Sequence, residues 1–333
     1  MDETSEMELA EIEKLTRKAL PSWGQAEIQL TPIEKGGSGR VFARVKNLVT
    51  GEQVVVVHYN LDRPDNERFA PVTEFLNRHG IPSPRLIAWD EGKHCVWVED
   101  LGARDLGDLE TADWERERRP AYFSTLETVR MLHRIKELEP PQDLPMLEPP
   151  FDEALYQWEQ AYFLEHYVSR FHSSKEVDYL RKDASLQALR EHLSALGRCL
   201  VHRDFQSTNV MLYQGKTCLI DYQGMRWGVP EYDLASLVFD PYTDFTPSER
   251  SELADYYFSL KQADGEVVGK AEFRSNLNRC GTQRLMQALG AYGFLGEVKR
   301  KTEFLEHIPA AKARLIELSQ EEGGIAVLGE LLK

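Results

Sequence analysis

The chain has 333 residues, of which 42% are hydrophobic, and its 55 Asp and Glu residues outnumber its 40 Lys and Arg residues, giving a formal net charge of -15. This length suits one large or two modest domains with a sizeable core, which excludes a disordered or collagen-like chain, and the acidic balance argues against a nucleic-acid partner because acidic surfaces repel phosphate backbones. No window approaches about 18 consecutive apolar residues, and the chain start lacks the cationic and apolar regions of a signal peptide, so we expect no membrane span and a cytoplasmic protein.

The N-terminal third of the sequence indicates one helix followed by a β-rich segment. Apolar residues at helical spacing predict the first helix, which Pro21 ends. The consecutive valines from Val54 to Val57 are the strongest strand signal in the chain. A second helix is expected to stop at Gly80. In chain order, the expected elements are a helix over 7–20, strands over 28–30, 41–46 and 54–59, a helix over 66–79, and strands over 85–89 and 94–99.

From Trp114 onward the helical period dominates, with one β-rich island. The expected elements are helices over 121–138, 154–171 and 183–196, short strands over 199–202, 210–213 and 218–221, and helices between 247 and 332. The two parts together predict an α+β fold with a small β-rich N-terminal lobe, 1–102, and a larger, mainly helical C-terminal lobe, 103–333. Ligands commonly bind where two such lobes meet.

The β-rich island carries the sharpest motif in the sequence, His202-Arg203-Asp204, with Asn209 and Asp221 downstream. The catalytic loop of protein kinases has the pattern H-R-D-x-x-x-x-N and is followed by a metal-binding Asp at a strand end. Asn209 stands at the same spacing from Asp204 as in this pattern. A lone triplet would be interpreted as a strand end, but the complete set between predicted strands favours a catalytic loop.

These residue types suit phosphoryl transfer from ATP. Asp204 can accept the proton of an acceptor hydroxyl that is held in line with the γ-phosphate. Oxygen atoms of Asn209 and Asp221 can bind Mg²⁺, a hard cation that neutralises phosphate oxygens. His202 orients the loop by hydrogen bonding and need not touch the substrate. We therefore assign Asp204, His202 and Arg203 to catalysis, and Asn209 and Asp221 to the metal.

A glycine-rich loop precedes the second predicted strand, where a lid over phosphates is expected. Gly36, Gly37 and Gly39 would let backbone N–H groups approach phosphate oxygens closely. Ser38 and Arg40 supply further donors. An ordinary turn is the alternative, and the catalytic motif downstream favours phosphate binding.

The strand after this loop departs from the kinase pattern, in which a Lys pairs with the α- and β-phosphates. The predicted strand 54–59 contains no Lys and ends in His58 and Tyr59. His58 either donates to phosphate when protonated or simply ends the strand, and both interpretations stay open. The remaining candidates for the missing charge are Arg40, Arg44 and Arg63.

Together these residues resemble the aminoglycoside phosphotransferase and choline kinase family, and within it the bacterial anomeric kinases of N-acetylmuramate and N-acetylglucosamine that serve cell-wall sugar recycling. The likeness runs over nearly the whole chain. The segments that carry it are 37–42 (GSGRVF), 80–84 (GIPSP), 99–102 (EDLG), 202–209 (HRDFQSTN), 220–224 (IDYQG), 230–237 (PEYDLASL) and 283–290 (QRLMQALG). The catalytic motifs are specific for the family and less specific for the sugar.

The resemblance implies a two-lobed protein-kinase-like fold, ATP and Mg²⁺ as cofactors, and a small-molecule hydroxyl as acceptor. It gives the catalytic motif the roles assigned above. It implies that adenine bonds to the backbone around 98–101, which includes Glu99 and Leu101. It also implies that Asp233 is a buried aspartate that braces the catalytic loop.

Residues beyond the motif offer candidates for acceptor binding. Gln206, Gln223 and Arg226 follow the metal-site residues and either meet substrate hydroxyl or acyl groups or bond only to the scaffold. Aromatic residues at helical spacing are more typical of a core than of a sugar-stacking face. The residues in question are Tyr156, Trp158, Tyr162, Phe163 and Tyr167.

Two further interpretations stay open. The same chemistry would serve an aminoglycoside, choline or homoserine kinase, and the missing strand Lys allows a nucleotide-binding pseudokinase. The sequence does not set the acceptor atom or the oligomeric state. Its four cysteines form no CxxC pair, so we expect free, buried thiols in a reducing compartment.

Overall fold

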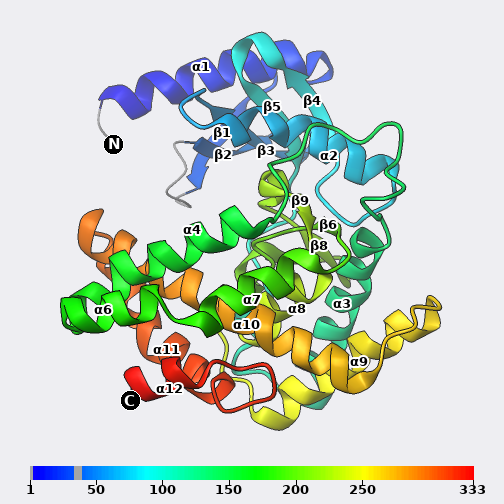
Figure 1. The fold of residues 1–333 in the computed structure, drawn as a ribbon. Coiled ribbons are helices and arrows are strands. Elements are labelled where there is room, and N and C mark those ends of the chain that lie inside the picture. The colour runs from blue at the N-terminus through cyan, green and yellow to red at the C-terminus, as the bar shows by residue number, and fades with distance from the viewer. Residues whose placement is uncertain (1–2, 34–39) are drawn as a thin grey trace. The chain divides into compact units, whose positions relative to one another are not determined.

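The computed structural model describes residues 3–33 and 40–333, which form two compact units (Figure 1). The sheet unit comprises the chain up to Arg104 and two later segments, Pro141–Glu148 and Met211–Gly224. The helical unit comprises Asp105–Pro140, Pro149–Val210 and Met225–Lys333. A β-sheet unit and a mainly helical unit confirm the predicted α+β fold class. The assignment of 1–102 and 103–333 to two lobes stays a prediction.

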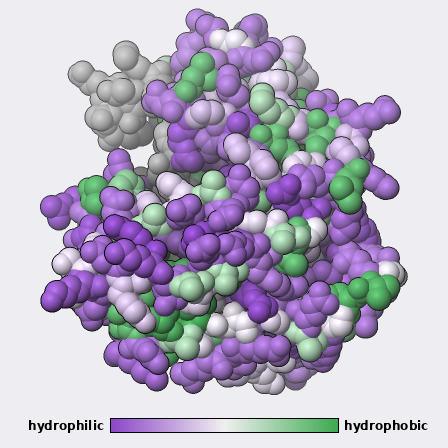
Figure 2. Space-filling view, viewed as in Figure 1, coloured by the Kyte–Doolittle hydropathy of each residue, from purple (hydrophilic) through white to green (hydrophobic). Residues whose placement is uncertain are grey.

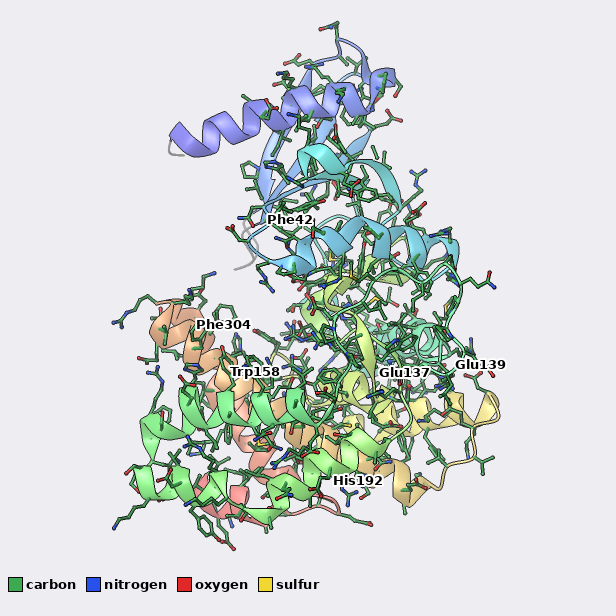
Figure 3. All side chains as sticks on the ribbon, turned by 45° about the horizontal axis from the view of Figure 1, so that its top comes forward. Phe42, Glu137, Glu139, Trp158, His192 and Phe304 are labelled. Carbon is green, nitrogen blue, oxygen red and sulfur yellow. The ribbon has the colours of Figure 1, made fainter. Side chains whose placement is uncertain are left out.

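The sheet unit is built on a five-stranded antiparallel sheet of order β1-β2-β3-β5-β4. Helices α1 and α2 lie on opposite faces of this sheet (Figures 1 and 3). The unit also holds the hairpin β7–β8. Its elements are α1 (Glu3–Ala19), β1 (Ile28–Ile33), β2 (Arg40–Asn47), β3 (Gln53–Tyr59), α2 (Phe69–Arg78), β4 (Leu86–Asp90), β5 (Cys95–Glu99), β7 (Val210–Tyr213) and β8 (Lys216–Leu219).

The face of the sheet that α1 covers is an apolar core. Side chains alternate between the two faces of a strand, and Val54 and Val56 of β3 share one buried cluster with Ile12 and Leu15 of α1. Within this core the indole nitrogen of Trp97 donates a hydrogen bond of 2.9 Å to the Thr16 hydroxyl. The apolar residues that recur at helical spacing in α1 and those that alternate along β3 therefore face the same core.

The helical unit is organised around the 24-residue helix α10, which packs against α4, α8 and α11. Its close packing depends on glycine: a Cβ on Gly293 would lie 2.0 Å from the backbone oxygen of His166. The elements of this unit are α3 (Arg119–His133), α4 (Glu153–Phe163), the π-helical turns Trp114–Arg118, Leu164–Val168 and Phe294–Val298, α5 (Ser169–Phe171), α6 (Ser174–Arg181), α7 (Ala184–Ala195), β6 (Cys199–Val201), β9 (Arg226–Gly228), α8 (Pro230–Val238), α9 (Pro247–Ala263), α10 (Lys270–Gly293), α11 (Ile308–Leu318) and α12 (Ala326–Leu331).

Several elements of the helical unit differ from the sequence prediction, and β9 and α8 are among those that were not predicted. The helix predicted over 121–138 ends at His133, because the backbone oxygen of Ile135 accepts from Leu200 (2.9 Å) and Lys136 forms a β-bridge with Cys199. Long-range strand pairing therefore outweighs helical propensity there. Helix α6 was not predicted, although Ser173 and Glu176 form a capping box at its start.

The thiols agree with the sequence expectation, and the surface is largely hydrophilic in the view drawn in Figure 2. On the face shown in Figure 2, hydrophilic residues predominate and apolar residues form small separate patches. All four cysteines, Cys95, Cys199, Cys218 and Cys280, are free and buried. Within the part of the chain that the structure describes, no helix combines the length and the apolar character needed to cross a membrane.

Candidate active site

The loop after β6 is clamped by a buried carboxylate in the first turn of α8. Asp233 is fully buried, and its two oxygens accept the backbone N–H groups of His202 (2.6 Å) and Arg203 (2.8 Å). The ring nitrogen Nε2 of His133 lies 3.0 Å from the same carboxylate. These bonds hold the backbone immediately before Asp204, so the bracing role expected of Asp233 is confirmed.

A second buried carboxylate holds the far end of this loop. Asp240 accepts from the backbone N–H (2.7 Å) and the hydroxyl (2.6 Å) of Ser207, and burial raises the pKa of its carboxyl group. Between the clamps, the amide nitrogen of Asn209 donates to the backbone oxygen of Asp204 (2.9 Å). This bond leaves Oδ1 of Asn209 as the atom of that amide which can bind a cation.

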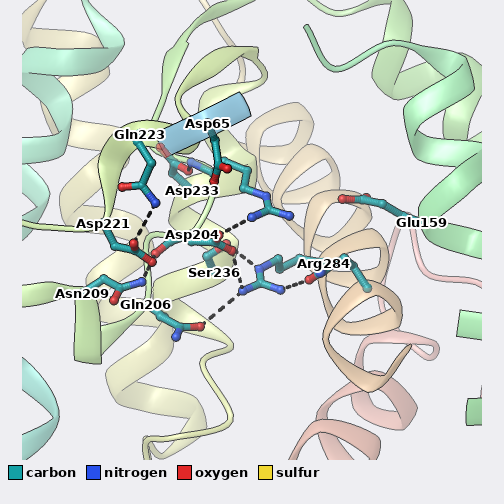
Figure 4. Close-up of polar contacts among 12 residues, drawn as sticks. Asp65, Glu159, Asp204, Gln206, Asn209, Asp221, Gln223, Asp233, Ser236 and Arg284 are labelled. Carbon is teal, nitrogen blue, oxygen red and sulfur yellow. Dashed lines mark hydrogen bonds and ion pairs between the residues drawn. The ribbon is translucent and has the colours of Figure 1, made fainter. Parts of the chain in front are cut away.

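The carboxylate of Asp204 lies between two arginines (Figure 4). It pairs with the guanidinium of its neighbour Arg203, and Nη2 of Arg284 lies 3.6 Å from its Oδ1. Burial alone would raise the pKa of Asp204, but the charges of Arg203, Arg284 and His202 together lower it below its usual value. The side chain still has 27% of its surface exposed. Asp204 is therefore an ionised and accessible carboxylate at neutral pH.

Two residues beside this loop were missed by the sequence reasoning. Arg284 of α10 also donates to the hydroxyl of Ser236 (3.0 Å) and to the amide oxygen of Gln206 (3.4 Å). Glu159 of α4 is 2% exposed, and it accepts from Tyr232 (3.0 Å) and Gln283 (2.9 Å). For Arg284 the available signal was its place in the segment 283–290, which carries part of the family resemblance.

The catalytic loop also contains local backbone strain. Arg203 has a φ of 80°, in the left-handed region that favours glycine. The Asp233 carboxylate holds this conformation through the backbone N–H of Arg203. His202 is fully buried, and its ring centre lies 6.0 Å from that of Phe205, while its orienting role stays a prediction.

In the sheet unit, Asp221 is brought together with two other predicted site residues. Its Oδ1 accepts from Nη2 of Arg40 (3.2 Å) and from the amide of Gln223 (2.9 Å). Asp221 has a φ of 61° and a side chain that is 41% exposed. The next residue, Tyr222, is hydrogen-bonded to the Thr73 hydroxyl of α2 (2.7 Å), which anchors this turn.

The other predicted nucleotide residues have contacts of their own. His58 of β3 is on the same alternating face as Val54 and Val56, which pack towards α1. Glu99 accepts from the hydroxyl of Tyr213 (3.3 Å), and Leu101 packs in a small cluster with residues of the β7–β8 hairpin. The predicted contacts of Gly36, Gly37, Ser38 and Gly39 lie outside the described residues.

The remaining acceptor candidates are divided between core and surface. The guanidinium carbon of Arg226 lies 5.1 Å from the centre of the Phe151 ring. Trp158 is 53% exposed and stacks on Tyr162, with ring centres 5.1 Å apart (Figure 3). The other aromatic residues of the predicted helix are buried, as expected for a core, and they are Tyr156, Phe163 and Tyr167.

The buried histidine of the loop clamp predicts a pH-dependent stability. Burial holds the pKa of His133 below its usual value despite the neighbouring Asp233 carboxylate. The unfolded chain therefore binds more protons than the folded one below pH of about 6.5, so this group costs stability as the pH falls through that value. Urea unfolding at pH 7.5 and 5.5 should show a smaller pH-dependent loss in His133→Gln than in the unmodified protein. Equal losses in the two proteins would contradict the assignment.

Comparison with known proteins identifies the family. A family model described as the phosphotransferase enzyme family matches residues 29–268. A protein of Pseudomonas putida named N-acetylmuramate/N-acetylglucosamine kinase is 24% identical over 320 residues, covering 93% of this chain and 90% of that protein. A Neisseria meningitidis protein of the same name is 29% identical over 150 residues, covering 44% of this chain and 45% of that protein.

Solved structures show the same fold. A choline/ethanolamine kinase family protein from Mesorhizobium loti has a TM-score of 0.64 at 16% identity, covering 97% of this chain and 99% of that one. The ADP-bound aminoglycoside phosphotransferase APH(2'')-Ib has a TM-score of 0.63 at 14% identity, covering 91% and 96%. The kinase-like fold predicted from the sequence is thereby confirmed. Because the family model spans most of the chain, including positions 204, 209 and 221, the protein belongs to the phosphotransferase enzyme family and is a small-molecule kinase.

Proposed function

We propose that this kinase transfers the γ-phosphoryl group of ATP to an amino sugar in the cytoplasm, with N-acetylmuramate or N-acetylglucosamine as acceptor at the anomeric hydroxyl. The observation that carries the proposal is the ionised carboxylate of Asp204, held between two arginines on a loop clamped at both ends. The name of the Pseudomonas putida relative, which matches 93% of the chain, supports this choice of acceptor.

In the proposed reaction Asp204 is the general base. The acceptor oxygen forms a bond to the γ-phosphorus, the bond from that phosphorus to its bridging oxygen breaks, and ADP leaves. The proton of the acceptor hydroxyl passes to the carboxylate of Asp204. Arg203 and Arg284 keep this carboxylate deprotonated at neutral pH, which is the form that accepts a proton. Asp233 and Asp240 keep the loop in place during the transfer.

The residues that the sequence motif assigns to the metal carry the donor atoms that magnesium prefers. Asp221 supplies a carboxylate that already pairs with a cationic group, the guanidinium of Arg40. Asn209 offers an amide oxygen, and Oε1 of Gln223 is buried without a hydrogen-bond partner among the described residues. Hard cations prefer such oxygen ligands. We assign Asn209 and Asp221 as the ligands of Mg²⁺, which when bound would neutralise charge on the phosphate oxygens.

The charges around Asp204 favour a neutral or anionic acceptor. Two guanidinium groups, those of Arg203 and Arg284, flank this single carboxylate. Glu159 is 2% exposed, and its oxygens are already engaged by the Tyr232 hydroxyl and the Gln283 amide. Aminoglycosides and choline are cationic and would be repelled there, whereas N-acetylglucosamine is neutral and N-acetylmuramate carries a carboxylate. Gln206, held by Arg284, is the proposed contact for an acceptor hydroxyl.

A competition experiment tests this acceptor choice. The protein is incubated with ATP, Mg²⁺ and a mixture of N-acetylmuramate, N-acetylglucosamine, kanamycin, choline and homoserine, and the products are identified by mass spectrometry. We expect phosphorylated amino sugar as the main product, with the acid lability typical of an anomeric phosphate. Phosphorylation of kanamycin, choline or homoserine without any sugar phosphate would refute the proposed acceptor. Nucleotide binding without transfer to any compound would indicate a pseudokinase.

A further inference from the structure

The strand that carries the phosphate-binding Lys in protein kinases lacks a cation here. Strand β3 contains neither Lys nor Arg, and its only titratable nitrogen side chain is His58. The neighbouring even-numbered residues Val54 and Val56 pack in the core beneath α1. By strand alternation His58 lies on that same face, whereas Val55 and Val57 lie on the other. A replacement cation would therefore come from a segment other than β3.

Strand β2 supplies two arginines on the face away from α1. Residues directly opposite each other in an antiparallel pair project to the same side of the sheet. Arg40 is opposite Tyr59, and Arg44 is opposite Val55, so both arginines share the face of the odd-numbered residues of β3. The two arginines differ in the anionic group that they contact.

Arg44 is committed to a structural contact. Its Nε and Nη2 atoms bond both oxygens of Asp100, at 2.5 and 2.9 Å, and Nη2 also donates to the backbone oxygen of Gly102 at 3.0 Å. The hydrogen bond with Asp100 raises the pKa of Arg44 further. This paired arginine ties β2 to the segment that follows β5. Arg63, the third candidate from the sequence, is 51% exposed and pairs with Asp65.

Arg40 instead contacts the proposed metal ligand. Its Nη2 lies 3.2 Å from Oδ1 of Asp221, and the Arg40 side chain is only 5% exposed. A guanidinium this well covered needs an anionic partner. If Asp221 binds a magnesium ion, its negative charge is shared between the ion and Arg40, and the ion pair of Arg40 with Asp221 becomes weaker. A nucleotide polyphosphate provides the replacement, because its oxygens match the planar donors of arginine.

We propose that Arg40 is the phosphate-anchoring cation of this kinase, paired with Asp221 in the unliganded protein and with polyphosphate oxygens in the nucleotide complex. The inference rests on the proposed function, since it requires ATP as the donor. It assigns to β2 the role that a lysine of the next strand has in protein kinases.

The test compares nucleotides that differ only in their phosphates. Calorimetric titration measures the affinity of the full chain for ATP, ADP and adenosine in the presence of Mg²⁺. For Arg40→Ala we expect ATP affinity to fall by roughly 10- to 100-fold, from the usual strength of a charged hydrogen bond, with little change for adenosine. Arg40→Lys should recover most of the loss. The matched control is Arg78→Ala, which removes another Arg–Asp pair of the same unit (3.1 Å to Asp143) and should leave all affinities unchanged.

Two results would overturn the inference. Equal weakening of ATP and adenosine in Arg40→Ala would show that the Arg40–Asp221 pair only supports the fold, and unchanged ATP affinity would show that Arg40 does not reach the phosphates. Both results would leave the proposed kinase function intact. An unmodified protein that binds no adenine nucleotide would contradict the proposed function and, with it, this role of Arg40.

Discussion

Replacing Asp204 by Asn is expected to lower kcat by about 10²–10⁴-fold, the usual effect of removing a general base. Asn has nearly the same size, so the loop between its two clamps should keep its conformation. The substitution removes the negative charge that Arg203 and Arg284 share, and the remaining amide cannot accept the acceptor proton at neutral pH. Initial rates of ADP release with the preferred sugar, together with calorimetric ATP affinity, measure the two effects separately.

The control for this experiment is Asp178→Asn, which alters an ion-paired aspartate on the surface helix α6. Its partner Arg181 lies 3.7 Å away, and both side chains are more than 60% exposed, so no change in rate is expected. Retention of the full rate by Asp204→Asn would refute the assignment of Asp204 as the base. Loss of rate accompanied by an equal loss of ATP affinity would refute it as well, because a base acts on the transfer step.

Replacing Asp233 by Ala should cause the largest loss of stability among the site variants. The fully buried carboxylate accepts two backbone N–H groups and contacts Nε2 of His133, and the Ala side chain would remove all three of these interactions. Breaking a buried charged network of this kind typically costs about 3–5 kcal/mol. The positive φ of Arg203 also loses its restraint, so kcat should fall together with stability. Urea unfolding monitored by circular dichroism measures the free energy of unfolding.

The matched control removes another carboxylate of the helical unit, which also contacts more than one partner but lies at the surface. Asp255 pairs with Lys270 (2.9 Å) and Arg274 (2.6 Å), but its side chain is 42% exposed. Exposed pairs contribute about 0–1 kcal/mol, so Asp255→Ala should be nearly neutral. Similar losses in Asp233→Ala and Asp255→Ala would contradict the view that Asp233 is the clamp of the catalytic loop.

The secondary structure could be predicted from the sequence where the hydrophobic pattern of an element matches the face that it buries in the fold. Val54 and Val56 of β3 pack in one core with Ile12 and Leu15 of α1, so the strand period and the helix period indicate the same core. The prediction was wrong at the end of α3, because pairing of Ile135 and Lys136 with the β6 region depends on residues more than 60 positions away. Helix α6 is a different case, since its capping box was readable and was overlooked.

For the site, the amino-acid sequence alone predicted the groups whose spacing along the chain is itself the signal: Asp204, Asn209 and Asp221. These residues follow one another within a short stretch of the chain, so their spacing can be recognised in the sequence. Only the tertiary structure placed Arg284 and Asp240 around this loop and distinguished Arg40 from Arg44 as a partner of Asp221. These contacts join residues that are distant in the chain, and an isolated Arg or Asp has no local pattern to mark its partner. The sequence motif therefore predicts which residues take part in the reaction. The charged groups that surround Asp204 depend on how helices and strands that are distant in the chain pack together.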